Sequence, residues 1–288
     1  MQLTMKRAAL VAALSFLALP AFAQTKNGKS ETYKDIIEKA YNLSLQRDRQ
    51  QALNILATAI QREARPQAIS ELKKTTAEVA NVFFSDKAQQ LFETGVSLRK
   101  TDLNQALDKV NEAARIEPDN FSIVNEQARL LIAKGDCKSA QENVQKQLKT
   151  VTFDEELKLS LAQALVCQGR WLEYQKIVDS VFIKKSPLQK FWQVLEVEKT
   201  LSQKSLTKAQ EALAGLKKSD EKYPELFYWT WKYEQMAKKA NLDDAQKYVM
   251  TCKNISANQY RQYMIDPMLC RRQVEVEGEL KGMNGTPE

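Results

Sequence analysis

The side chains that could do chemistry in this chain are its carboxylates and its four cysteines, because the 288-residue sequence contains no histidine. The absence of histidine excludes Ser–His–Asp and Cys–His catalysis, histidine-ligated zinc or haem, and pH switching by an imidazole. Acidic neighbours such as Glu155 and Glu156, or Asp243 and Asp244, fall at expected turns or helix starts, where they favour the positive end of the helix dipole. Glycoside cleavage needs two carboxylates in one cleft, and the sequence places no such pair. We therefore expect no catalytic residue, no metal site and no cofactor.

The four cysteines are Cys137, Cys167, Cys252 and Cys270, and none of them forms a Cys-x-x-Cys motif. That spacing argues against a dithiol oxidoreductase. In an exported chain, four cysteines indicate disulfide bonds, for which three connectivities exist. The alternative is four independent buried thiols. To choose among the three connectivities and the free-thiol alternative, the helices that carry the cysteines must first be located.

Residues 1–23 have the pattern of a secretory signal peptide. Lys6 and Arg7 form a positive leader, residues 8–19 form an apolar run, and Ala21-Phe22-Ala23 is a small-residue cleavage site before Gln24. The run is too short to span a bilayer core of about 30 Å, and no later stretch approaches 18 apolar residues. We expect an exported protein without a transmembrane segment in the mature chain, located in a periplasm or, as the alternative, outside the cell.

The composition excludes further classes of protein. The 43 Lys and Arg residues exceed the 36 Asp and Glu residues by seven and are scattered, so the charge does not indicate a nucleic-acid partner. Weak contact with anionic polymers of the cell envelope is the most that this charge suggests. Only 8 glycines are present, which leaves little material for phosphate-binding loops.

A repeated set of apolar positions predicts the elements. A small or aromatic residue, an aliphatic residue four positions later and a small or apolar residue three beyond it recur along the chain. The first members after residue 100 are Ala106, Ala140, Tyr174, Ala209 and Ala245, at spacings of 34, 34, 35 and 36 residues. Each set has helical spacing and follows a polar break and a second amphipathic stretch. The sequence thus predicts helical hairpins that bury a continuous apolar seam when they stack, and no strands.

Individual residues also indicate where these helices pack closely and where they begin. Gly95, Ala128 and Ala162 allow a neighbouring helix to approach closely. Patterns at residues 152–155, 186–189 and 207–210 are typical of capping boxes, and Pro66 and Pro224 are typical of first helical turns.

The repeat unit resembles the tetratricopeptide repeat family, whose 34-residue signature combines a Leu–Gly–x2–Tyr segment with a later Ala–x3–Phe segment and a proline. Residues 88–120 match best. Later units depart from the signature, since Lys158 replaces the large opening residue and Tyr174 the small one. The resemblance implies an all-α solenoid of about five or six hairpins in a right-handed superhelix, which serves protein–protein interaction. The matching positions are Leu91, Gly95, Leu98, Ala106, Val110, Ala113 and Pro118-Asp119-Asn120.

The expected organisation follows from these patterns. It comprises the signal peptide (1–23), a flexible linker (24–30), a divergent N-terminal hairpin with an extra helix (31–87), tetratricopeptide-like repeats (88–183), divergent C-terminal repeats with a closing helix (184–281) and a tail (282–288). We expect the extra helix over residues 67–84 and the closing helix over 268–281.

The repeat register predicts the disulfides. Cys137 lies at the turn of one hairpin and Cys167 just before the equivalent turn of the next, so both fall on one edge of the stack. Cys252 ends one helix and Cys270 lies early in the next. We predict the pairs Cys137–Cys167 and Cys252–Cys270.

A partner-binding groove is expected along the first helices of the hairpins. Arg99 or Arg129 would bind a carboxylate of a peptide in two-point fashion. The alternative is that the apolar members only pack between adjacent helices. The candidates, offset from the core positions, are Phe92, Val96, Arg99, Asn125, Arg129, Ile132, Leu159, Gln163 and Val166.

A second candidate surface is the aromatic stretch at residues 226–233. The register assigns Trp229 and Tyr233 to the core, which leaves Phe227, Tyr228 and Trp231 to anchor a partner or to pack on a neighbouring helix.

Two functions remain after these exclusions. The first is a non-catalytic exported scaffold or adaptor of the cell envelope, which binds a protein or peptide in the groove. The alternative is a module that binds a small molecule or a glycan such as peptidoglycan in the same groove, with Tyr228 and Trp231 stacking on sugar rings.

Overall fold

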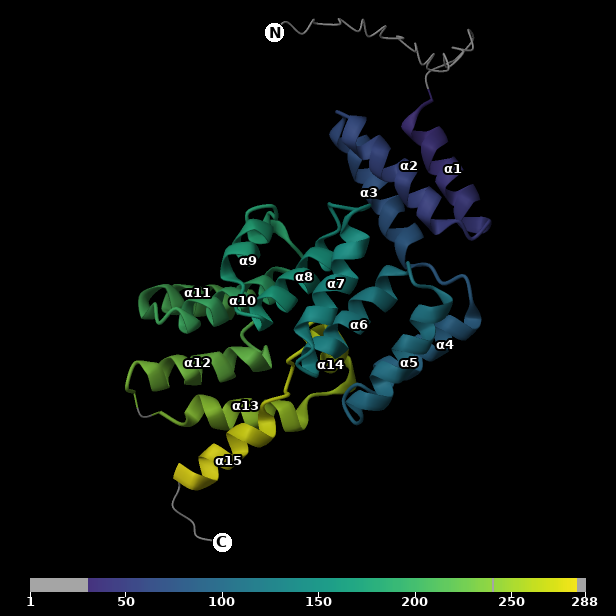
Figure 1. Ribbon diagram of the computed structural model, residues 1–288. Helices are drawn as coiled ribbons and strands as arrows, with labels where there is room; N and C mark the ends of the chain where they lie inside the picture. Colours follow the sequence, from purple (N-terminus) through teal and green to yellow (C-terminus); the bar gives the residue numbers. More distant parts are fainter. Residues whose placement is uncertain (1–30, 240, 284–288) are drawn as a thin grey trace, which may run out of the picture. The chain divides into compact units, whose positions relative to one another are not determined.

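A computed structural model describes residues 31–239 and 241–283, and every regular element in those ranges is a helix (Figure 1). The described residues from Tyr33 onward belong to one compact unit. The predicted signal peptide (1–23) and linker (24–30) lie outside the described residues, as does most of the predicted tail.

The helices pair into the hairpins that the periodicity predicts, so the all-α stack of helical hairpins is confirmed (Figure 1). Within the described ranges the helices are α1 (Tyr33–Leu45), α2 (Arg49–Arg62), α3 (Pro66–Asn81), α4 (Asp86–Leu98), α5 (Leu103–Ile116), α6 (Phe121–Ala133), α7 (Cys137–Leu148), α8 (Glu155–Cys167), α9 (Trp171–Val178), a 3₁₀ turn (Ile183–Lys185), α10 (Gln189–Ser202), α11 (Leu206–Ser219), α12 (Pro224–Met236), α13 (Asp243–Asn254), α14 (Ala257–Tyr263) and α15 (Gln273–Met283).

The hairpins are α1/α2, α4/α5, α6/α7, α8/α9, α10/α11 and α12/α13. Among their first helices, α6 packs on α8, α8 on α10, and α10 on α12, which makes one continuous row. Helix α3 is the predicted extra helix, and it packs on α1, α2 and α6. We call the surface formed by α4, α6, α8, α10 and α12 the first-helix face.

The core positions of the repeat are buried where the register predicts them. Ala106, Val110, Ala140, Tyr174 and Ala245 are all inaccessible to solvent. Because the small and aliphatic members alternate along each helix at helical spacing, each hairpin buries one stripe against its neighbour.

Gly95 allows α4 and α5 to approach closely. A Cβ atom at this position would lie 2.6 Å from Cγ2 of Val110 and 2.9 Å from the carbonyl oxygen of Ala106. Both distances are below van der Waals contact, so the helix pair requires glycine here.

The predicted capping boxes are wrong, although the proline signals are correct. Helix α8 is capped by Asp154, whose carboxylate accepts from the Leu157 amide at 2.8 Å, and Thr152 lies in the preceding turn. Helix α10 begins only after Leu188, and Ser205, which precedes α11, makes no side-chain cap. A capping box does occur at α14, between Ser256 and Gln259. Pro66 and Pro224 open α3 and α12 as predicted.

The closing helix is shorter than predicted. Residues 264–272 form a series of turns, and α15 begins at Gln273 rather than at residue 268. The reason is local backbone geometry: Cys270 has a φ of 56°, in the left-handed region, which a right-handed helix cannot include. We call residues 264–272 the C-terminal strap.

Candidate functional site

The structure brings most predicted groove residues together on the first-helix face, but it buries them. Phe92 and Val96 are half-buried, and Phe92 packs against Phe83 with ring centroids 5.3 Å apart. The buried members are Arg99, Asn125, Arg129, Ile132, Leu159, Gln163 and Val166.

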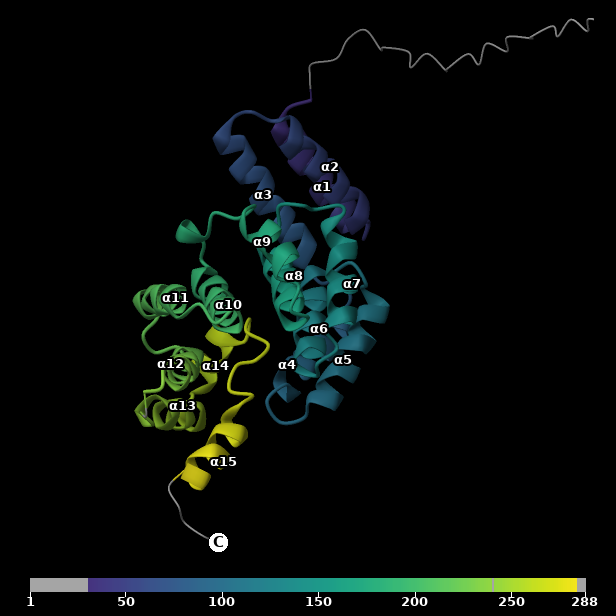
Figure 2. The same cartoon turned by 60° about the vertical axis from the view of Figure 1, so that its left-hand side comes forward.

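The C-terminal strap contacts two of these residues, Arg99 and Gln163. The Arg99 guanidinium donates to the carbonyl oxygen of Met264 and, at 2.8 Å, to that of Asp266. The side-chain amide of Gln163 donates to the carbonyl oxygen of Ile265 at 3.0 Å. Figure 2 shows the strap, in yellow, between the helices α4–α8 and the helices α10–α13. The predicted groove therefore holds a segment of the same chain.

The two arginines predicted to bind a partner's carboxylate already have carboxylate partners. Arg99 lies 3.2 Å from Glu126, and both side chains are 1% exposed. Arg129 lies 3.6 Å from Glu126 and 2.5 Å from Glu156. Sequence analysis missed Glu126, although its position three residues before Arg129 on one helix face was a usable signal.

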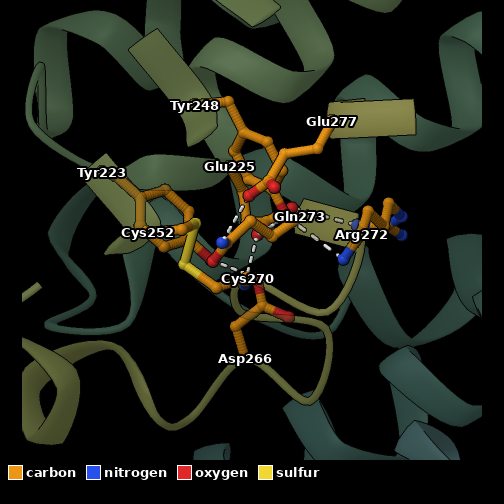
Figure 3. The surroundings of a disulfide bond; sticks show 9 residues. All are labelled: Tyr223, Glu225, Tyr248, Cys252, Asp266, Cys270, Arg272, Gln273 and Glu277. Atoms are coloured by element: carbon orange, nitrogen blue, oxygen red, sulfur yellow. Dashed lines mark hydrogen bonds and ion pairs between the residues drawn. A yellow bond between two sulfur atoms is a disulfide. The ribbon is translucent and has the colours of Figure 1, made fainter. Parts of the chain in front are cut away.

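A buried carboxylate on α12 anchors the other end of the strap (Figure 3). Glu225 is fully buried, accepts from the Cys270 amide at 2.8 Å and pairs with Arg272 at 3.0 Å. Burial raises the pKa of Glu225, while Arg272 acts in the opposite direction and favours the charged carboxylate. Asp266 of the strap accepts from the Tyr223 hydroxyl and from the Met268 amide.

Two disulfides join the cysteines in the pairing that the repeat register predicts. Cys137 at the start of α7 is bonded to Cys167 at the end of α8, with Cα atoms 6.1 Å apart. Cys252 at the end of α13 is bonded to Cys270 in the strap, with Cα atoms 5.5 Å apart. The second disulfide fixes the strap to the α12/α13 hairpin (Figure 3).

The aromatic stretch of α12 faces the other way from the predicted register. Tyr228 and Trp231 are buried, whereas Phe227, Trp229 and Tyr233 are half-buried. Tyr228 and Trp231 belong to a core formed with α13 and α15, and the Tyr228 and Tyr248 rings are 5.5 Å apart. The register failed because α12 has neighbours on two sides, so it buries two stripes rather than one.

A cavity of about 180 Å³ lies beside the strap, between α8, α10 and α12. Its polar lining residues are Gln163, Glu198, Asp266 and Arg272, and Trp229 provides an aromatic wall. The strap thus forms one wall of the cavity.

The described part of the chain contains neither a cluster of metal ligands nor a membrane-spanning helix. No group of three or more His, Cys, Asp or Glu residues in it could hold a metal ion. None of its helices is long and apolar enough to cross a membrane.

Comparison with known proteins does not assign the chain to a family. No family model matches the chain, and no curated protein matches it. Among solved structures, the chain is similar to a tetratricopeptide repeat protein from Parabacteroides merdae, at 14% identity and a TM-score of 0.43. The match covers 90% of this chain and 95% of that one.

Proposed function

We propose that this chain is a non-catalytic, exported scaffold protein of the cell envelope, and that it binds a peptide segment of a protein partner on the first-helix face. The supporting observation is the strap itself. Side chains of α8 and of the end of α4 hold its main chain by donating to three consecutive carbonyl oxygens, those of residues 264–266. Recognition through main-chain carbonyls does not depend on a peptide's side chains, so it suits peptides of different sequence that follow the path of the strap.

The export proposal has separate support. Two disulfides among four cysteines are typical of proteins that fold in an oxidising compartment. Cleavage of the predicted signal peptide would leave Gln24 as the first residue, which mass spectrometry of the purified protein tests directly. A mass that retains residues 1–23 would contradict this part of the proposal.

The burial of two aromatic residues argues against the glycan-binding alternative. Tyr228 and Trp231 were the residues expected to stack on sugars, and both are enclosed in the core between α12, α13 and α15. We therefore retain the peptide-binding scaffold as the proposed function.

In this proposal the partner peptide takes the place of the strap. A tethered segment competes at an effective concentration in the millimolar range, so loosening the strap should raise the affinity for a partner. The test compares the wild-type chain with Cys252→Ser/Cys270→Ser, which unties the strap, in cross-linking of an envelope fraction followed by mass spectrometry. Arg99→Met in the untied background removes two of the three carbonyl contacts, and Arg115→Met, at an exposed position of α5, is the matched control.

We expect the untied variant to cross-link a defined partner peptide to α4, α6 and α8. This product should decrease with Arg99→Met and persist with Arg115→Met. Cross-links confined to the outer helices α5, α7 and α9, or identical yields from the wild-type and untied chains, would reject the first-helix face as the binding surface.

A further inference from the structure

The cavity beside the strap is large enough for an organic ligand. Its volume is about 180 Å³. An apolar cavity of about 150 Å³ holds benzene, whereas one water molecule needs only about 10–15 Å³. The cavity therefore has room for a six-membered ring with a short polar arm.

Two hydrogen-bond acceptors of this cavity have no partner. Gln163 is 3% exposed, and its amide nitrogen donates to Ile265, but its Oε1 atom is buried and accepts no hydrogen bond. The carboxylate of Glu198 makes no hydrogen bond or ion pair with any residue in ranges 31–239 and 241–283. The buried Oε1 atom of Gln163 lacks a donor, which destabilises the protein, so a ligand that brings donors to it and to the half-buried carboxylate of Glu198 would complete the site.

The charges around the cavity favour a cation. Asp266 contributes a second carboxylate to the lining. The nearby guanidinium of Arg272 is already paired with Glu225 at 3.0 Å and stacks over the Trp229 ring at 5.1 Å. Burial raises the pKa of Glu198, and Arg272 only partly counteracts this effect. The carboxylate of Glu198 thus forms no ion pair with a basic side chain of the described residues.

The remaining walls are apolar. They are provided by helices α6, α8, α10 and α12 together with the strap, and include Ile132, Val166, Val194, Leu195, Pro267 and Met268. A suitable ligand therefore combines a donor-rich positive group with a compact apolar body.

We propose that this cavity is a binding site for a small organic amine. The ammonium group donates to Glu198 and to Oε1 of Gln163, and the apolar body packs between Trp229 and the aliphatic side chains of α10. This site shares Gln163 and the strap with the peptide contacts of the proposed function, but it requires the strap to be in place, so ligand binding to the wild-type chain and peptide binding to the untied chain are tested separately.

The test is isothermal titration calorimetry of the full mature chain with three probes of similar size: 2-phenylethylamine, 2-phenylethanol and phenylacetate. We expect the amine to bind at least about tenfold more tightly than the alcohol, because charge-assisted hydrogen bonds are roughly twice as strong as neutral ones. Glu198→Gln should remove this preference and leave alcohol binding unchanged. Glu196→Gln is the matched control, since Glu196 lies on the same helix but pairs with Lys199 at 3.0 Å.

Two further measurements keep the result interpretable. Thermal unfolding of each variant verifies that it is folded, and Glu198→Asp, which retains the charge, should keep part of the preference for the amine. Equal affinities for the three probes, an equal loss with Glu196→Gln, or no binding of the amine up to about 10 mM would each overturn the proposal.

Discussion

Arg272 and Glu225 form an ion pair away from water, with side-chain exposures of 14% and 0%. Removal of one partner from such a pair leaves a buried charge without compensation. At the residue scale, the Arg272 guanidinium is therefore one of the groups on which the attachment of the strap to α12 depends.

Arg272→Met should lower the free energy of unfolding by about 3–5 kcal/mol at pH 7. Urea unfolding followed by circular dichroism measures this loss. Lys247→Met is the control, because Lys247 is 58% exposed beside Asp244 and its loss should cost less than about 1 kcal/mol. Equal effects of the two substitutions would show that the Arg272 pair does not stabilise the fold.

Gly95→Ala should destabilise the protein by about 1–3 kcal/mol, because the new methyl group would overlap Val110 and the Ala106 carbonyl. Gly278→Ala is the matched control: Gly278 lies within α15, and a Cβ atom added there would have no neighbour within 4 Å. In that helix, alanine should instead stabilise by up to about 1 kcal/mol. Thermal unfolding of both variants should show shifts of opposite sign, and shifts of the same sign would contradict the packing argument.

Asp154 predicts a dependence of stability on pH. Burial, together with the charges of Glu155 and Glu156, raises its pKa from 3.8 to about 6 in the folded protein. The folded state therefore binds the proton more tightly than the unfolded chain, so this residue's contribution to stability is greatest below pH 4 and declines as the pH rises through 6.

Asp154→Asn keeps a capping oxygen for the Leu157 amide but does not titrate. The variant should gain stability relative to the wild type between pH 4 and pH 6, as measured by urea unfolding at several pH values. Asp136→Asn, at the exposed cap of α7, is the control. A stability difference for Asp154→Asn that is constant over this pH range would be inconsistent with the raised pKa.

At the scale of the elements, the Cys252–Cys270 disulfide holds the strap against α13. It closes a loop of 18 residues, which corresponds to about 3 kcal/mol on the loop-entropy model. The strap also contains Arg271 and Arg272, two adjacent sites for trypsin.

Cys252→Ser/Cys270→Ser should expose these arginines to cleavage, because segments that open locally are the ones that proteases cut. Timed trypsin digestion with mass spectrometry detects the cut after Arg271 or Arg272. Cys137→Ser/Cys167→Ser carries the same type of change outside the strap and should stay intact there. Early cleavage in both variants, or in neither, would show that the disulfide does not control the strap.

The helical hairpins could be predicted because the apolar residues that each helix buries lie within a few positions of one another in the sequence. Ala106, Val110 and Ala113 define one buried stripe at helical spacing, and the same stripe recurs along the chain. The strap was not predictable, since its turns depend on partners far away in sequence, such as Gln163, which lies 102 residues before Ile265. The position of Glu198 at the cavity was likewise not predictable, because the cavity forms only where three hairpins and the strap meet. The partner-binding role of the groove residues remains a prediction.

On the scale of the whole molecule, the strap connects hairpins that would otherwise contact only their neighbours. Repeat proteins usually behave as chains of nearest-neighbour units, which unfold in parts. Here Arg99, at the end of α4, contacts Asp266, and Glu225 of α12 contacts Cys270. These contacts should make the α4/α5 and α12/α13 hairpins unfold together.

Hydrogen exchange followed by mass spectrometry can test this coupling. In the wild type, amides of α4–α8 and of α12–α13 should exchange with similar free energies of opening. In Cys252→Ser/Cys270→Ser, the two regions should separate, with α12–α13 exchanging faster. Separate exchange already present in the wild type would show that the strap does not couple the hairpins.

Because the strap lies near the end of the chain, it is synthesised well after the residues of α4 and α8 that it contacts. Arg99 emerges 167 residues before Asp266. At a synthesis rate of about 5–20 residues per second, this interval lasts roughly 8–33 s. Once Gln163 is also made, 102 residues before Ile265, all the side chains of α4 and α8 that donate to the strap exist before the strap is translated.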